Sequence, residues 1–265
     1  MTENRLLLRK IEDKIERFLR YYTPMSSDFL SMEEQSRVAP VIRKYANEGV
    51  FFWGGFPQAE RKMILFMPDY TGIGCEEDTF SPGKGNFTGD DCPAVAVEIT
   101  TAPLDRGKLS HRDYLGAILA EGITRAKVGD IIVREQGAIV IATREMGTYL
   151  KENLTTVGRC EVKCRIKPLE EIKFEDAGTT LQKFTVSSPR VDNILVVGFG
   201  ISRKNAVDAV GSGKVFIDDI QISKPDMQLR GDEKVVLRGK GKFIYRGETG
   251  LSRKGKHYIQ IEKYM

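Results

Sequence analysis

One stretch constrains the fold of this chain more than any other. Residues 194–206 read ILVVGFGISRKNA, an apolar run followed by a G-x-G pair at Gly198 and Gly200 and then by a polar segment. This pattern is typical either of a strand that enters the glycine turn of a dinucleotide-binding fold or of a helix, a tight turn and a second helix. Asp218, which lies 20 positions after Gly198, stands where the first interpretation needs a ribose-binding acid.

The residues before the run favour a helix. Ser188 is a good N-cap, and Pro189 suits the first helical position, where its missing N–H has no cost. Apolar or small residues then recur at the i, i+3, i+4 and i+7 positions, namely at Val191, Ile194, Leu195 and Gly198. We therefore expect a short helix that ends at Gly198.

The residues after the run also argue against a dinucleotide site. Arg203 stands where the fingerprint has its third glycine, and its bulk prevents close approach of helix and strand. Ser202 is placed to cap a second helix that closes at Gly211 or Gly213. Arg203 and Lys204 in its first turn oppose the helix dipole, and a local rule broken in this way is typical of a functional surface.

Charge is unevenly distributed along the chain. The net charge is +4, yet residues 183–265 hold 16 Lys and Arg against 9 Asp and Glu. A basic last third on a slightly acidic body favours a nucleic-acid-binding module, with a merely solvated lysine-rich face as the alternative. No run of about 18 apolar residues is present, and the Leu6–Leu8 run is too short for a signal peptide, so we expect a cytoplasmic protein.

The chain is long enough for two or three domains, and its pattern is of the α+β class. Residues 1–55 form a segment with helical periodicity, which includes a capping box formed by Ser31 and Glu34. The run MILFMP from Met63 is typical of a buried strand, and residues 72–92 of a loop.

Residues 56–170 are expected to form a central domain. From Ala94 onward the pattern is strand, helix, strand, strand, helix, strand, which is the ferredoxin-like arrangement. Many enzymes and RNA-recognition modules share this order, and no aromatic strand of the RNA-recognition type is present. A polar linker over 171–183 then leads to a last domain over 184–265.

Neither a metal nor a cofactor is expected. Cys160 and Cys164 fall on one face of an alternating strand, but a zinc site would need Cys75 and Cys92 from distant segments. His111, Arg112 and Asp113 are compatible with acid–base chemistry, but Ser110 and Asp113 have the spacing of a capping box. We expect capping, with RNA contact by Arg112 left open.

The last domain resembles the S-four RNA-binding domain, also called the alpha-L motif. The resemblance covers about 60 residues and rests on four elements in the same order: Arg190-x-Asp192, Ser202-Arg203, Gly213-x-Val215 and Gly231-Asp232. It implies an RNA-binding fold of two helices and a small sheet. One departure is Asp218-Asp219 in place of a neutral pair; these acids either form a hairpin turn that points to solvent or weaken RNA binding at that edge.

The remainder of the chain resembles the YlmH family. The stretches that carry this resemblance are GGFPQAERKMILFMP, LSHRDYLGAILAEGI, VGDIIV and YLKENLTTVG. It implies a bacterial RNA-binding protein from a cell-division gene neighbourhood, with a helical start, a central domain assigned to RNA binding and the S-four-like module, and without catalytic activity.

The expected partner is structured RNA, either rRNA or tRNA on the ribosome. The alternative is an RNA-modifying enzyme, like a pseudouridine synthase or methyltransferase, that the same domain targets. In the tail, Phe243, Tyr245 and Tyr258 either stack on unpaired bases or face inward from a β-ribbon. The cations that we expect to bind RNA are Arg112, Arg190, Arg203, Lys204, Lys214, Arg238, Lys240, Lys242 and Arg246.

Overall fold

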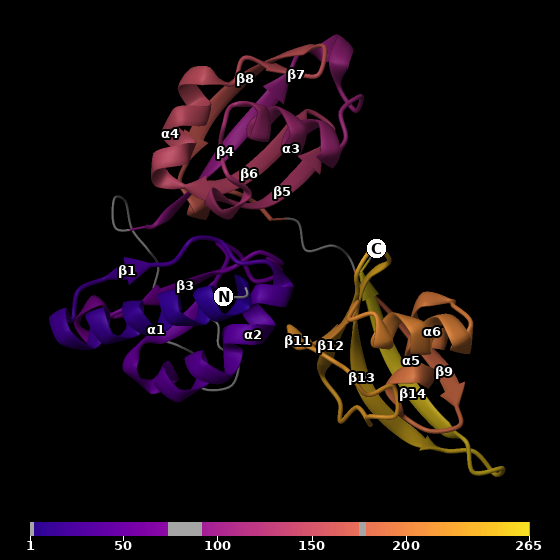
Figure 1. The fold of residues 1–265 in the computed structure, drawn as a ribbon. Helices are drawn as coiled ribbons and strands as arrows, with labels where there is room; N and C mark the ends of the chain where they lie inside the picture. Colours follow the sequence, from indigo (N-terminus) through magenta and orange to yellow (C-terminus); the bar gives the residue numbers. More distant parts are fainter. Residues whose placement is uncertain (1–2, 74–91, 175–178, 265) are drawn as a thin grey trace. The chain divides into compact units, whose positions relative to one another are not determined.

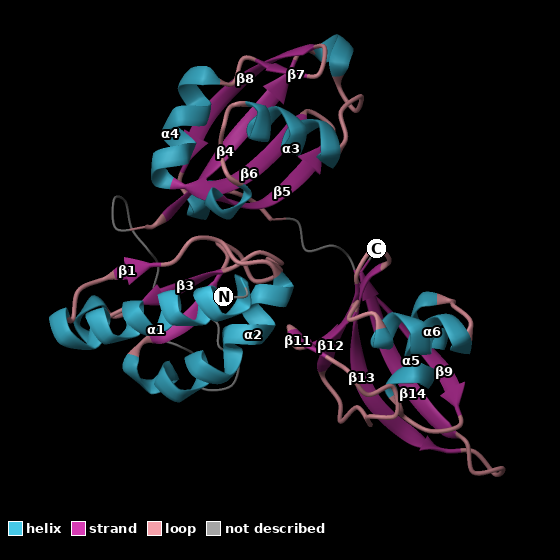
Figure 2. Ribbon diagram, viewed as in Figure 1, coloured by secondary structure: helices cyan, strands magenta, loops and turns pink. Residues whose placement is uncertain are grey.

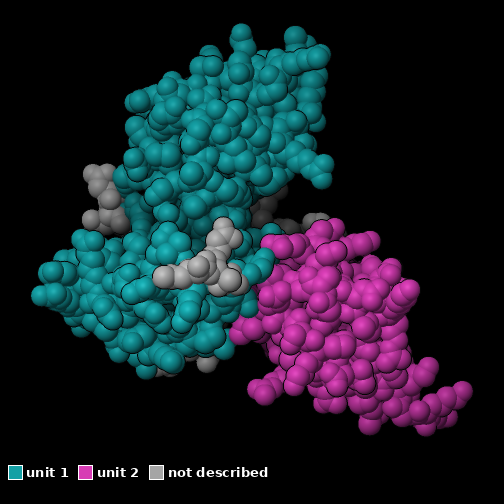
Figure 3. Space-filling model, in the orientation of Figure 1, with its two compact units in different colours: residues 1–174 teal, residues 175–265 magenta. Residues whose placement is uncertain are grey.

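The computed structural model describes residues 3–73, 92–174 and 179–264 (Figure 1). Most of the expected 72–92 loop, with Cys75, lies outside the described residues. The chain divides into two compact units, residues 1–174 and residues 175–265 (Figure 3). Helices and antiparallel sheets occur in both units, which confirms the mixed α+β class.

The first part of unit 1 packs helices on a small sheet. Helices α1 (Glu3–Tyr21) and α2 (Met32–Ile42) are followed by the 3-10 turn η1 (Arg43–Glu48). The predicted capping box of Ser31 and Glu34 is present at the start of α2. The sequence did not predict β1 (Met25–Ser26) or β2 (Val50–Trp53), which flank the predicted buried strand β3 (Met63–Phe66) in a three-stranded sheet.

The second part of unit 1 has the predicted order of strands and helices, with one short additional strand, β7 (Thr156–Val157), that was not predicted. The elements are β4 (Ala94–Thr101), α3 (His111–Ala120), β5 (Val128–Arg134), β6 (Gly137–Thr143), α4 (Arg144–Asn153), β7 (Thr156–Val157) and β8 (Cys160–Lys167). The sheet is antiparallel, with strand order β5-β6-β4-β8-β7. Both helices cover one face of it (Figure 2), where Val97, Tyr114 and Leu150 share a core.

The opposite face of this sheet carries the first part of the unit. Ala96, Ile139 and Ile141 there pack with Phe29 and Trp53 in one apolar cluster. This shared core explains why the helical start and the central sheet form one compact unit.

A second tie within unit 1 is a group of polar side chains that we call the Asp130 cluster, formed by Arg61, Arg125 and Asp130. The Arg61 side chain donates from Nε to the carbonyl of Val128 at 3.0 Å. Its Nη2 donates to the carbonyls of Phe29 at 3.0 Å and of Arg125 at 3.3 Å. One guanidinium therefore ties the segment that carries Arg61 to residue 29 and to residues 125–128.

Unit 2 is a six-stranded antiparallel sheet with two helices on one face. Its strand order is β11-β10-β12-β13-β14-β9. The elements are β9 (Thr179–Val186), α5 (Val191–Phe199), α6 (Arg203–Gly211), β10 (Val215–Ile217), β11 (Ile220–Gln221), β12 (Glu233–Leu237), β13 (Gly241–Leu251) and β14 (His257–Tyr264). Ile194 and Leu195 of α5 and Ala206 of α6 share one core with the sheet.

Strand β9 differs from expectation, because residues 179–183 fall within the predicted 171–183 linker. The strand pairs with β14 along its whole length, from Thr179 opposite Tyr264 to Val186 opposite His257. Its polar composition is that of an edge strand with one solvated face, since only Val186 is fully buried.

The opening stretch is helical, as predicted: α5, and not a strand, leads directly into the glycine turn. The predicted cap is wrong in detail, because the N-cap is Arg190 rather than Ser188. The N–H groups of Val191 and Asp192 donate to the carbonyls of Met227 and Pro225, at 2.8 and 2.9 Å. A distant segment thus satisfies the first donors of α5, and no side-chain cap is needed.

Gly198 and Gly200 serve packing and turn geometry. A Cβ at Gly198 would lie 2.2 Å from the Phe243 ring, so only glycine lets α5 lie this close to β13. Gly200 ends α5 in the left-handed region, with φ +63. Close packing at Gly198 and the helix end at Gly200 therefore account for the two glycines without a dinucleotide site.

No helix among the described residues has the length and apolar character needed to cross a membrane.

Candidate nucleic-acid interface

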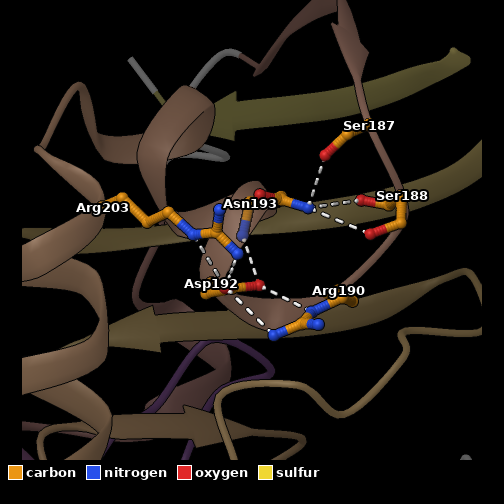
Figure 4. A network of polar contacts seen from close by, with 6 residues as sticks. All are labelled: Ser187, Ser188, Arg190, Asp192, Asn193 and Arg203. Atoms are coloured by element: carbon orange, nitrogen blue, oxygen red, sulfur yellow. Dashed lines mark hydrogen bonds and ion pairs between the residues drawn. The ribbon is translucent and has the colours of Figure 1, made fainter.

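The starts of α5 and α6 meet at one buried carboxylate. Asp192, in the first turn of α5, is 1% exposed and binds two arginines from different segments (Figure 4). Arg190 approaches with Nε at 3.1 Å from Oδ1 and Nη2 at 3.3 Å from Oδ2. Arg203, the first residue of α6, places Nε and Nη2 at 3.3 and 3.1 Å from Oδ2. We call these three residues the Asp192 cluster.

The Asp192 cluster fixes two cations at the surface. A buried carboxylate needs paired charges and hydrogen bonds, and both arginines supply them. The arginine side chains remain open to solvent, at 36% exposed for Arg190 and 65% for Arg203. Two guanidinium groups share one carboxylate, so the cluster carries net positive charge and holds it in a defined orientation.

The start of α6 adds further features that suit an anion. The Ser202 side chain accepts a hydrogen bond from the Asn205 N–H at 3.1 Å, which confirms Ser202 as the N-cap. Lys204 is exposed in the same turn as Arg203. The first N–H groups of any helix lack acceptors within it, so an anion here would meet cations and backbone donors together.

Asn193 stiffens the same region. Its side-chain amide donates to the hydroxyls of Ser187 and Ser188, at 3.1 and 3.0 Å, and to the Ser188 carbonyl at 3.2 Å (Figure 4). The extended segment between β9 and α5 is therefore bound to the helix that carries Asp192.

A second group of predicted cations lies past the other end of α6. Lys214 lies three residues after the end of that helix, and its carbonyl accepts from the Arg238 N–H at 2.9 Å. Lys240 lies two residues further, and all three side chains are exposed. The nine residues of α6 separate this group from Arg203 by roughly 13 Å along the helix, at 1.5 Å per residue. Lys242 is half-buried on β13.

Arg246 has a different setting from the other predicted cations. Its side chain bonds the carboxylates of Asp232 at 2.7 Å and Glu262 at 2.6 Å. Hydrogen bonds to both acids raise the pKa of Arg246. Two carboxylates neutralise this guanidinium, which makes Arg246 the weakest phosphate-binding candidate of the set.

The Asp218-Asp219 pair forms the hairpin turn between β10 and β11. Both residues have positive φ, at 47 and 64, as two-residue hairpin turns require. The Asp218 carboxylate accepts from the Lys234 N–H at 2.8 Å, and Asp219 pairs with the Lys234 ammonium at 2.7 Å. Of the two alternatives for these acids, the hairpin turn is the one that the structure has, and Lys234 offsets part of their charge.

The tail aromatics divide between the two alternatives. Phe243 and Tyr245 are buried in the core of unit 2, which is the inward-facing arrangement. Tyr258 is 44% exposed and stays available for contact.

The central domain holds Arg112 at the start of α3. The predicted capping box is present: the Asp113 carboxylate accepts from the Ser110 N–H and hydroxyl, both at 2.7 Å. These bonds lower the pKa of Asp113. His111 and Arg112 are exposed in this first turn, as expected for a cap, and RNA contact by Arg112 stays a prediction.

The described cysteines do not gather. Cys92, Cys160 and Cys164 are free thiols, and burial raises the pKa of Cys164 to about 11. Among the described ranges, no three His, Cys, Asp or Glu side chains are grouped as a metal site.

Sequence reasoning named the cations but not the residue that organises them. Asp192 is part of the Arg190-x-Asp192 motif, but the sequence alone gives it no structural role. The available signal was one acid within the apolar helix VDNILVV, where a buried charge requires partners.

Comparisons with known proteins match both parts of unit 1. A family model described as "YlmH, N-terminal" matches residues 3–71, and one described as "Putative RNA-binding domain in YlmH" matches residues 96–171. The Bacillus subtilis (strain 168) protein named ribosome-associated protein quality control protein P2 is 26% identical over 242 residues, which cover 91% of this chain and 88% of that protein. A solved structure of the cell division protein ylmH from Streptococcus pneumoniae is 20% identical, with a TM-score of 0.48 over 65% of this chain and 96% of that one.

The two family models together cover more than half of the chain, and the similarity to the Bacillus subtilis protein extends over nearly all of it. The chain belongs to the YlmH family.

Proposed function

We propose that this chain is a non-catalytic, cytoplasmic RNA-binding protein that binds structured rRNA or tRNA on the ribosome. The observation that carries the proposal is the Asp192 cluster, in which a buried carboxylate holds two solvent-facing arginines at the starts of adjacent helices. In this proposal unit 2 is an S-four-like (alpha-L) domain, and β4 to β8 with their helices form a ferredoxin-like RNA-binding domain.

The comparisons support the class of partner. The family model over residues 96–171 is named for RNA binding, and the Bacillus subtilis relative is named for association with the ribosome. The geometry supports recognition by charge and shape. Cations at fixed positions contact phosphates, which set register and orientation without reading bases.

In this proposal Arg203 and Lys204 make the main phosphate contacts. They share the first turn of α6, where exposed side chains and helix N–H groups meet the same phosphate. The remaining predicted cations extend the face toward Lys214, Arg238 and Lys240. Arg190 stays paired with Asp192 when Arg203 is removed, so the fold tolerates the loss.

The test is filter binding of ribosomal RNA across a salt series. Replacing both residues, Arg203→Ala with Lys204→Ala, is expected to weaken binding by about tenfold or more at moderate salt. Each lost phosphate contact lowers the slope of log affinity against log salt by roughly 0.7–0.9.

Two controls separate the face from net charge. Arg9→Ala with Lys10→Ala removes the same charge from exposed positions on α1, and Arg112→Ala removes one cation from α3. Both are expected to change affinity less than the α6 pair. Wild-type affinity and slope for the α6 pair would exclude this face.

A further inference from the structure

The turn that joins β13 to β14 lies beyond the last strand pairs of the unit 2 sheet. On one side, β12 pairs with β13 only as far as Tyr245, whereas β13 continues to Leu251. On the other side, β9 pairs with β14 along its whole length and ends at Val186, opposite His257, where β14 begins. The turn after Leu251, drawn yellow at the lower right of Figure 1, therefore projects past the paired strands.

This turn is a closed, well-bonded loop. The Ser252 N–H donates to the Lys256 carbonyl at 2.7 Å, and the Gly255 N–H donates to the Ser252 carbonyl at 2.9 Å. The Ser252 hydroxyl accepts from the Lys256 N–H at 2.9 Å. Gly255 has φ +72, the left-handed residue that ends a three-residue hairpin loop. We call residues 252–256 the hairpin tip.

The hairpin tip carries only positive charge. Arg253, Lys254 and Lys256 are exposed, and no acid occurs between Thr249 and Lys256. The nearest acid, Glu248, contacts the His257 ring at 2.6 Å. Three like charges on a short rigid loop repel one another, so the arrangement costs stability unless a partner supplies negative charge.

The flanks of the tip are apolar and open. Leu251 and Tyr258 lie on neighbouring strands just behind it, and both are exposed. Exposed cations with an aliphatic and an aromatic side chain behind them are suited to RNA. Its phosphates offer anionic oxygens, and its unpaired bases offer flat faces for stacking.

We propose that the hairpin tip is a second RNA-contact site, which lies across the phosphates that border a groove of double-helical RNA. The two strands of an A-form helix bring their phosphates close together along its deep, narrow major groove, which side chains do not read. Arg253, Lys254 and Lys256 then contact phosphates of both groove edges without entering the groove.

This inference rests on the proposed RNA-binding function and adds a site separate from the helix starts. Lys254 lies three residues before His257, which pairs with Val186, so the two Cα atoms are at most roughly 10 Å apart, at 3.3 Å per residue for a fully extended chain. Ser187, which follows Val186, bonds Asn193 beside the Asp192 cluster. One structured RNA is therefore able to touch the helix starts and the hairpin tip together.

The test compares two triple variants of the full chain with equal loss of charge. The first variant, Arg253→Ala with Lys254→Ala and Lys256→Ala, removes all three cations of the hairpin tip and keeps Ser252 and Gly255, which form the turn. Lys183→Ala with Lys224→Ala and Arg230→Ala removes three exposed cations elsewhere in unit 2. Binding is measured on ribosomal RNA, on a synthetic RNA duplex and on poly(U), each across a salt series.

The tip variant is expected to bind ribosomal RNA and the duplex about tenfold or more weakly, with the salt slope lower by roughly 2–3. Its loss on poly(U) is expected to be smaller, and the control variant is expected to stay near wild type. An equal loss on duplex and poly(U), or an equal loss in both variants, would overturn the proposed groove contact.

A second measurement distinguishes RNA from a protein partner. A photo-crosslinking amino acid at position 254 of the full chain is expected to attach to RNA in ribosomal particles, and attachment only to protein would overturn the proposal. The two proposals fail differently. If the wild type does not bind RNA, the proposed function fails; if the wild type binds and the tip variant matches it in affinity and slope, only the tip contact fails.

Discussion

The Asp130 cluster and the Asp192 cluster contain the same residue types, two arginines and one aspartate, but they use them in opposite ways. In the Asp130 cluster the guanidinium groups turn inward to backbone carbonyls, and the carboxylate accepts from the Glu60 and Arg61 N–H groups at 2.6 and 3.1 Å. In the Asp192 cluster the carboxylate is buried and the guanidinium groups face solvent.

The difference shows that the role of an arginine depends on whether its guanidinium group is buried against backbone carbonyls or exposed to solvent. Desolvation lowers the pKa of Arg61, and lowers the pKa of Arg125 to about 10, because the surrounding protein disfavours the charged form. Their donors serve backbone carbonyls of unit 1. Arg203, more than half exposed, keeps its charge at the surface. The first cluster ties together the fold of unit 1, and in the proposed function the second presents charge to RNA.

The largest expected effect comes from breaking the inward cluster. Arg61→Ala removes the side-chain donor of the Phe29 carbonyl and one of two donors from the carbonyls of Arg125 and Val128. An unsatisfied carbonyl costs about 1–3 kcal/mol when water cannot replace its donor, and the two weakened carbonyls add to that cost. We expect a loss of about 2–4 kcal/mol in the free energy of unfolding of unit 1. The single tryptophan, Trp53, is buried in unit 1, so its fluorescence in urea reports this transition.

The control for that change is Arg112→Ala, an exposed arginine in the same unit, expected to stay within about 0.5 kcal/mol of wild type. RNA affinity of folded Arg61→Ala is expected to match wild type. Equal urea midpoints for the two variants would show that the Asp130 cluster does not stabilise the fold.

A smaller effect separates position from charge in the Asp192 cluster. Asp192→Ala adds one unit of positive charge but removes the group that orients Arg190 and Arg203. Because both arginines reach solvent, we expect a stability loss of only about 1–2 kcal/mol, less than for a fully buried pair. RNA affinity is expected to fall several-fold despite the added charge.

Asp208→Ala is the matched control, because it removes an exposed acid of α6 outside the cluster. It is expected to bind ribosomal RNA as well as wild type or slightly better. If Asp192→Ala also binds more tightly in filter binding, net charge rather than orientation governs affinity.

The sequence predicted elements whose pattern is local. The strand predicted to begin at Ala94 is β4 (Ala94–Thr101), and the periodicity after Val191 predicted the helix that is α5. The sequence did not predict β9, whose polar residues become a strand only by pairing with β14. The paired residues lie 71 positions apart for Val186 and His257 and 85 positions apart for Thr179 and Tyr264. Strands that depend on such distant partners leave little local signal.

The candidate site shows the same division. Composition and motif showed that cations gather in the last third, and the turn role of Asp218-Asp219 was among the alternatives. The sequence did not show which polar groups are paired. Arg246 binds both Asp232 and Glu262, and the first N–H groups of α5 donate to the carbonyls of Pro225 and Met227. Which cations stay available depends on these tertiary contacts.

The smallest expected effect concerns alkaline pH, where the two units contain different buried acids. Desolvation raises the pKa of the Cys164 thiol in unit 1 from 9.0 to about 11, and that of the Tyr245 hydroxyl in unit 2 from 10.0 to about 12. Unit 2 contains no cysteine. Each raised pKa means that the folded state keeps a proton that the unfolded state releases.

The stabilising contribution of Cys164 is therefore complete below pH 9 and is lost as pH rises toward 11, whereas that of Tyr245 is lost only between pH 10 and 12. We expect Trp53 fluorescence to show a fall of roughly 2–4 °C in the Tm of unit 1 by pH 10. Cys164→Ser should reduce that fall, and Tyr245→Phe should leave it unchanged. A fall of equal size in Cys164→Ser and wild type would assign the alkaline sensitivity of unit 1 to other groups, such as the buried Cys92 thiol, whose pKa desolvation also raises.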